Sequence, residues 1–216
     1  MNNQEFVSEI CKYYKESREL KIPDNPYEIW RGVNHSISSK SEDLFALFIA
    51  KRLNDSTLEF IVDKTMTCKI SGGKSIQFRP DLAIVENGVL THSIDLKMDM
   101  GYKRRYFETE AFENLQKRFN IFRKQSFESV SYKKNDNTKI YLDVSSKIKN
   151  QIVVISEKNG GKSSNRRDMI LDISKRDWVD IYYLTGVVHP NNASNKSPRL
   201  NVEEFDRLIK DIRVLV

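Results

Sequence analysis

Two aspartates and a lysine near the middle of the chain have the residue types and the spacing that metal-dependent phosphodiester chemistry uses. Asp81 is followed, after thirteen residues, by Asp95-Leu96-Lys97. Alternate side chains of a strand point to opposite faces, so Asp95 and Lys97 point the same way if they lie on a strand. Carboxylate oxygens bind Mg²⁺ or Mn²⁺, and an ammonium group offsets negative charge on a phosphate. This set can therefore bind a divalent metal and act on a phosphodiester.

A tight hairpin is expected to bring these residues together. Residues 75–85 and 89–98 both read as strands, and the Asn87-Gly88 pair between them is a strong signal for a two-residue antiparallel turn. In such a hairpin Asp81 lies roughly opposite the segment from Asp95 to Lys97. The spacing of the three residues along the chain is thus compatible with one shared site.

The competing interpretation is that the three residues are ordinary surface charges. Two features argue against it. Pro80 removes a backbone donor, which suits a bulge or an edge beside a site more than a regular ladder. Both strands are also rich in Ile, Leu, Val and Ala, and a charge buried among such residues is costly unless it is paired or binds a metal.

The pattern resembles the signature of the PD-(D/E)xK nucleases, the superfamily that contains many type II restriction endonucleases, Holliday-junction resolvases and repair nucleases. The resemblance covers about residues 40–156. It implies that Lys97 orients or helps to deprotonate the attacking water, and that the products carry a 5′-phosphate and a 3′-hydroxyl. It also implies Mg²⁺, with Mn²⁺ as a substitute. The implied metal ligands are the carboxylates of Asp81, Asp95 and Glu42 and the carbonyl of Leu96.

Glu42 has two interpretations. The family usually contributes a carboxylate from the helix that precedes the first three antiparallel strands (the meander), and Glu42 lies over the apolar face of such a helix. However, Ser39 and Glu42 also form a capping box, in which the glutamate bonds to the backbone of the N-cap residue and needs no other role. Asp43 is the alternative ligand if Glu42 only caps the helix.

The order of elements predicts an α/β fold with a central mixed β-sheet flanked by helices. Helix, three-strand meander, helix and strand follow one another, which by the resemblance is a restriction-endonuclease-like core. We expect one nuclease domain over residues 1–216, with the catalytic core at about 40–156. Helices are expected at 4–19, 40–54, 105–124 and 202–214, and strands at 57–62, 64–70, 75–85, 89–98, 151–156 and 180–188.

Excess positive charge favours a polyanionic partner. The chain has 36 Lys and Arg against 30 Asp and Glu, a formal charge of +6, and a pI near 9.1. Polar loops that could face DNA are expected at 126–137, 158–167 and 190–199. A basic run on a solvated surface is the alternative for each cluster. The candidate DNA-binding residues are Lys103, Arg104, Arg105, Lys133, Lys134, Lys162, Arg166 and Arg167.

Other metal chemistry and membrane insertion are not expected. Cys11 and Cys68 lack the spacing of a zinc or redox motif and read as core thiols, and the three histidines are too scattered for a histidine-rich metal site. Residues 1–5 lack the charged and apolar regions of a secretory signal, so none is expected, and the longest apolar run, residues 44–50, is too short to cross a membrane. We expect a soluble cytoplasmic protein.

The resemblance and the basic charge together predict an Mg²⁺-dependent endonuclease that cuts double-stranded DNA, above all a sequence-specific type II restriction endonuclease. A homodimer is expected because two strands require two active sites, with a cognate DNA methyltransferase encoded separately. Two alternatives stay open: a structure-specific nuclease of repair or recombination, and a nucleic-acid-binding module with a dead nuclease site. The complete Asp81, Asp95 and Lys97 set counts against the dead module.

Overall fold

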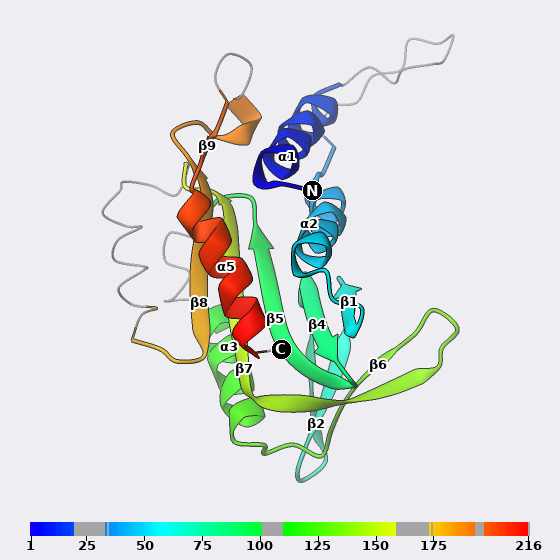
Figure 1. Ribbon diagram of the computed structural model, residues 1–216. Helices are drawn as coiled ribbons and strands as arrows, with labels where there is room; N and C mark the ends of the chain where they lie inside the picture. Colours follow the sequence, from blue (N-terminus) through cyan, green and yellow to red (C-terminus); the bar gives the residue numbers. More distant parts are fainter. Residues whose placement is uncertain are drawn as a thin grey trace.

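The computed structural model describes residues 1–19, 33, 35–100, 110–158, 173, 175–192 and 197–215. In these residues the chain forms an α/β fold, with a mixed β-sheet that has helices on both sides (Figure 1). The helices are α1 (Asn3–Ser17), α2 (Ser38–Leu53), α3 (Glu110–Arg123) and α5 (Val202–Leu215), and Pro190–Asn192 form a 3₁₀ turn, η2. The strands are β1 (Leu58–Val62), β2 (Met66–Ile70), β3 (Lys74–Phe78), β4 (Leu82–Glu86), β5 (Val89–Lys97), β6 (Ser129–Lys133), β7 (Lys139–Ser156), β8 (Val179–Gly186) and β9 (Arg199–Leu200).

The sheet has two parts that share the long strand β7. In the first part β1, β4 and β5 pair antiparallel, β5 and β7 are parallel, and β7 and β8 are parallel. Helix α3 lies in the chain between β5 and β7, as a crossover between parallel strands requires. In the second part the order is β3-β2-β6-β7, and all neighbours are antiparallel.

Apolar side chains pack on both faces of the first part of the sheet. Helices α1, α2 and α5 cover one face, where the rings of Phe6 and Phe48 stack with their centroids 4.8 Å apart. Helix α3 covers the other face, where Phe119 stacks on Trp178 at 5.4 Å. Both cysteines are free thiols, and Cys68 is buried in the core beside α3, as expected. None of the described helices combines the length and the apolar character that crossing a membrane demands.

The hairpin that was expected to form the site is present. Glu86 pairs with Val89, and the turn residues Asn87 and Gly88 have φ angles of 49° and 80°. Positive φ at both central positions is the requirement that makes Asn-Gly favourable in such turns. The helices predicted at 4–19, 40–54 and 202–214 and the strands predicted at 89–98 and 180–188 are confirmed, with ends that differ by a few residues.

The strand expected at 75–85 is wrong as one element. β3 ends at Phe78 and β4 begins at Leu82, and the two strands belong to different parts of the sheet. Pro80 lies in the break, where its missing N–H removes a ladder bond. The meander therefore consists of β1, β4 and β5, and the β2–β3 hairpin is an excursion between its first two strands.

Two segments expected as loops contain regular structure. Residues 126–137 include β6, and residues 190–199 include η2 and the start of β9. The strand expected at 151–156 is the last part of β7, which begins at Lys139. The prediction missed β6 and most of β7 because polar side chains on one face of these strands make the segment look like a loop. Of the loop expected at 158–167, residues 159–167 lie outside the described residues.

Candidate active site

Strands β4 and β5 bring Asp81, Asp95 and Lys97 together. Leu82 pairs with Ile94, so Asp81, directly before β4, lies opposite Asp95. Asp95 and Lys97 share one face of β5 because side chains alternate along a strand. The side chains are largely buried, with exposed fractions of 21 % for Asp81 and Lys97 and 20 % for Asp95. The structure thus assembles three residues that the sequence places together.

The ammonium of Lys97 lies among the oxygens of both acids and of the backbone. Its Nζ is 3.2 Å from Asp81 Oδ2 and 3.8 Å from Asp95 Oδ1. The same nitrogen is 3.4 Å from the carbonyl oxygen of Leu96. The oxygens expected to bind a metal from Asp81, Asp95 and Leu96 therefore face one positive charge.

Asp81 is held in place by a backbone donor. The N–H of Leu96 donates to Asp81 Oδ2 over 2.6 Å. Burial raises the pKa of the Asp81 carboxyl, and the Asp95 carboxylate raises it further. The Lys97 ammonium and the bond from Leu96 act in the opposite direction without cancelling the rise. The single ammonium thus leaves the pair of acids short of positive charge, which is the condition in which a divalent cation stabilises them.

Asn150 is a member of the site that the sequence analysis missed. It lies on β7, paired with Ser93 of the neighbouring strand β5, and it is fully buried. Its amide nitrogen donates to Asp95 Oδ2 over 3.2 Å. The only signal in the sequence is an asparagine just before a run of apolar strand residues, and the partner strand could not be read from that run.

Glu42 lies near the site but outside this contact group. Helix α2 begins at Ser38, and its N-cap residue Ile37 has no side-chain capping bond, so the capping box expected for Ser39 and Glu42 is wrong. Burial raises the pKa of Glu42, and the charges of Asp81 and Asp63 raise it further. Asp43, the alternative ligand, is exposed. Glu42 is thus close enough to interact with Asp81 through space.

The oxygen donors fit Mg²⁺ or Mn²⁺ in kind. Within the part of the chain that the structure describes, no three histidine, cysteine, aspartate or glutamate side chains are grouped closely enough to hold a metal ion. Asp81 and Asp95 offer two carboxylates, and Leu96 offers a carbonyl. Mg²⁺ commonly binds one or two protein carboxylates and keeps several waters, or takes substrate phosphates as further ligands. A site with two acids and one carbonyl meets that requirement.

The predicted DNA-binding residues divide into two groups. Lys133 ends β6, Lys134 follows it, and both are exposed. The other predicted residues lie outside the described part of the chain; they are Lys103, Arg104, Arg105, Lys162, Arg166 and Arg167.

Comparison of the chain with protein-family models, with curated proteins and with solved structures found no match in any of the three.

Proposed function

We propose that this chain is a metal-dependent endonuclease that hydrolyses phosphodiester bonds in double-stranded DNA. One observation carries the proposal: oxygens of Asp81, Asp95 and Leu96 lie around the ammonium of Lys97 at 3.2 to 3.8 Å. Acids and a lysine that are this deeply buried need a reason beyond surface charge, because burial of unpaired charge is costly. Catalysis on a phosphate ester supplies that reason.

Each residue has a role that follows from its chemistry. Asp81, Asp95 and the carbonyl of Leu96 would hold Mg²⁺ or Mn²⁺, and Asn150 would keep the Asp95 carboxylate in position. The bound cation would supply Lewis-acid activation of the phosphate and of a water molecule. Lys97, as the ammonium, would orient the attacking water and offset the charge that develops on the phosphate oxygens.

The arrangement of the sheet supports the resemblance to the PD-(D/E)xK nucleases. Helix α2, the antiparallel strands β1, β4 and β5, helix α3 and the parallel strand β7 follow in the order expected for that core. Asp95 and Lys97 lie near the end of β5, the strand that pairs antiparallel with β4 on one side and parallel with β7 on the other. A restriction-endonuclease-like core is therefore the fold that we propose.

Within this class we propose a type II restriction endonuclease that acts as a homodimer in the cytoplasm, with a separately encoded methyltransferase. Cutting two strands at one site requires two such centres. A nuclease specific for forks or junctions would use the same centre, and it would differ in the DNA that it cuts. Discrete fragments from linear phage DNA would favour restriction, whereas cleavage limited to branched DNA would favour repair or recombination.

The test is digestion of phage DNA in Mg²⁺ and in EDTA, with purified wild-type protein and an Asp95→Asn control. We expect cleavage only by the wild-type protein and only with the metal. Cleavage by both proteins would point to a contaminating nuclease. If the wild-type protein binds DNA but does not cut any duplex or branched substrate in Mg²⁺ or Mn²⁺, the chain is a binding module and the nuclease proposal is wrong.

A further inference from the structure

The second part of the sheet has one apolar face and one open polar face. Side chains alternate between the faces, so Met66 and Cys68 of β2, Phe78 of β3 and Val130 of β6 pack toward α3. The residues between them point the other way. No described helix covers that second face, since α1, α2 and α5 pack on the first part of the sheet.

A row of polar side chains crosses this open face. Gln77 pairs with Thr67, Thr67 with Ser131, and Ser131 with Tyr141, so one residue of each strand from β3 to β7 stands in line. Gln77, with an amide group, and Tyr141, with a hydroxyl group, are exposed at the two ends of the row, and Tyr141 is 61 % exposed, whereas Ser131 between them is buried. Such groups donate readily to phosphate and sugar oxygens of nucleic acid.

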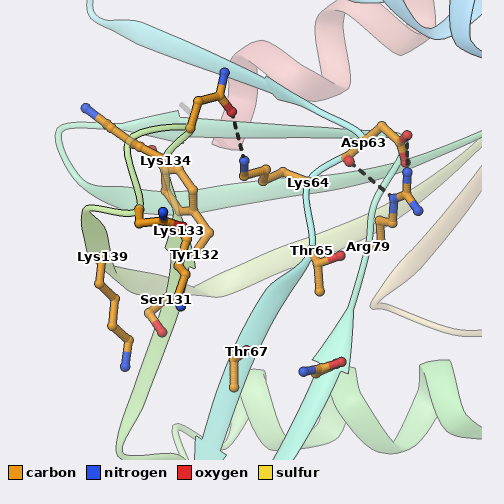
Figure 2. A pocket seen from close by; sticks show the side chains of 13 residues that line it. Asp63, Lys64, Thr65, Thr67, Arg79, Ser131, Tyr132, Lys133, Lys134 and Lys139 are labelled. Carbon is orange, nitrogen blue, oxygen red and sulfur yellow. Dashed lines mark hydrogen bonds and ion pairs between the residues drawn. The ribbon is translucent and has the colours of Figure 1, made fainter.

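Three members of this row, Gln77, Thr67 and Ser131, line a basic groove. Its volume is about 670 Å³, and its other lining residues come from the segment that joins β1 to β2, from Arg79 after β3, and from the end of β6 through the turn to the start of β7 (Figure 2). One acid, Asp63, lines the groove. The cations that line it are Lys64, Arg79, Lys133, Lys134 and Lys139.

Much of the positive charge in the groove lacks an acidic partner. Arg79 pairs with Asp63, and Lys64 bonds to the amide oxygen of Asn135 at 3.3 Å. The ammonium of Lys139 lies 4.8 Å from the centre of the Tyr141 ring. No ion pair within 4 Å to Lys133, Lys134 or Lys139 is found among the described residues, and Lys134 interacts only through space with the carboxylate of Asp136. A groove of one sign attracts a polyanion, because its field adds up over the whole surface.

The groove begins where the candidate active site ends. Arg79 is two residues before Asp81, and the N–H of Asp63 donates to the carbonyl oxygen of Asp81 over 3.1 Å. Glu42 interacts electrostatically with Asp81 and Lys97 on one side and with Asp63 and Arg79 on the other. The candidate active site and the basic groove are therefore neighbours along the segment from Arg79 to Asp81.

We infer that this groove binds the phosphate backbone of the DNA duplex next to the bond that is cut. The inference rests on the proposed function, and it adds the surface that holds the substrate. A lysine cluster on an ordinary solvated face is the simpler interpretation. It accounts neither for the groove, nor for the polar side chains that line it, nor for its position beside the acids. The β2–β3 excursion and the β6–β7 hairpin then bind substrate with one face, while their other face completes the core beside α3.

The test compares two triple variants with the same loss of charge. The groove variant carries Lys133→Gln, Lys134→Gln and Lys139→Gln. The matched control carries Lys15→Gln, Lys51→Gln and Lys210→Gln, all exposed positions on helices α1, α2 and α5. Affinity for a fluorescent DNA duplex is measured by anisotropy over a series of salt concentrations, in EDTA and in Ca²⁺. Thermal unfolding checks the fold of each variant.

The two variants should differ in salt dependence as well as in affinity. Each phosphate contact contributes about 0.9 to the slope of log Kd against log salt concentration, so the groove variant should lose roughly 2 to 3 from that slope. Its Kd at low salt should rise by at least tenfold, on the order expected for such a loss. The control variant should keep the wild-type slope. If the groove variant melts early, the single variants Lys133→Gln and Lys139→Gln, each with a slope loss of about 1, replace it.

Failure of the groove and failure of the nuclease give different results. Equal affinity and slope in the two triple variants, with DNA cleavage by the wild-type protein, would overturn the groove and leave the nuclease. Loss of binding only in the groove variant, without cleavage by the wild-type protein, would support the groove as a DNA-binding surface and overturn the nuclease. Absence of duplex binding by the wild-type protein in both EDTA and Ca²⁺, or tighter binding of an RNA duplex, would overturn the inference.

Discussion

The acidic centre and the basic groove share the segment from Arg79 to Asp81 but arrange charge in opposite ways. In the centre, two acids and one lysine are about four-fifths buried, and opposite charges are within 4 Å of each other. In the groove, lysines such as Lys133 and Lys139 are exposed, and the charges are nearly all of one sign. The centre pairs one lysine with two acids and has room for one more positive charge, whereas the groove holds an excess of positive charge for an anionic partner.

This difference separates the expected effects of substitutions. A buried charge pair fixes the position of its members, and removal of one member leaves the other uncompensated. Exposed charges of one sign act through their common field, which governs affinity and salt dependence. Variants of the centre should therefore change turnover, whereas variants of the groove should change binding. A variant of the centre that weakens DNA binding without lowering turnover would contradict this division between the centre and the groove.

The largest effect is expected for Asp95→Asn and Asp81→Asn. Each variant replaces an anionic oxygen with a neutral one, so cleavage should be abolished and affinity for Mg²⁺ or Mn²⁺ should fall. Duplex binding in EDTA should remain, because the groove is untouched. Isothermal titration measures the metal affinity. Unchanged metal affinity in both variants would remove Asp81 and Asp95 as ligands.

Lys97→Ala should be the next most severe change. The ammonium is proposed to act on water and on the transition state, so its loss should lower the cleavage rate by a factor on the order of 10² to 10⁴. DNA affinity in Ca²⁺ should stay within a few-fold of wild type, since binding to the ground state does not depend on this group. A near-normal single-turnover rate for Lys97→Ala would show that the nuclease interpretation of β5 is wrong.

Asn150→Ala should have an intermediate effect. Asn150 donates to Asp95 and is proposed to position it, and loss of such a supporting bond typically lowers metal affinity or activity about 10- to 100-fold. Gln151 is the matched control because it is the next residue of β7, is equally buried and points to the other face. Gln151→Ala should destabilise the fold without a selective loss of metal affinity. Equal metal affinities in the two variants would reduce Asn150 to a structural residue.

Local patterns allowed the centre to be predicted. Asp95 and Lys97 share a face because β5 is regular between them, and Asn87-Gly88 sets the turn that brings Asp81 opposite. Both features depend on residues close together in the chain. The contact from Asn150 depends on the parallel pairing of β5 with β7, which begins more than forty residues after β5 ends. Nothing in the local sequence reveals such a pairing.

The groove could not be predicted either, because it also depends on how strands pair. Lys133 and Lys134 were recognised as candidate DNA-binding residues, but their segment was interpreted as a loop because every second residue is polar. The alternation of Val130 and Tyr132 is the signature of a half-buried strand, and the open face that it implies was missed. The strand predicted at 75–85 concealed the break at Pro80, which sends β3 to the groove and β4 to the centre.

Glu42→Gln should have the smallest effect, and it tests the border between the two regions. The carboxyl of Glu42 interacts with Asp81 and Lys97 in the centre and with Asp63 and Arg79 beside the groove, but it is not one of the oxygens around Lys97. Because its influence acts through space, we expect cleavage to fall by on the order of tenfold rather than to disappear.

Stability should not fall in this variant. The structure rules out the capping role, and burial together with the charges of Asp81 and Asp63 makes the ionised form of Glu42 unfavourable, as its raised pKa indicates. A neutral glutamine of the same shape should therefore leave the melting temperature unchanged or slightly higher in the absence of metal. Complete loss of cleavage and of metal affinity would show that Glu42 joins the ligands when the cation binds, and the centre would then extend to the edge of the groove. Full activity would instead confine the centre to Asp81 and to the residues of β5 and β7.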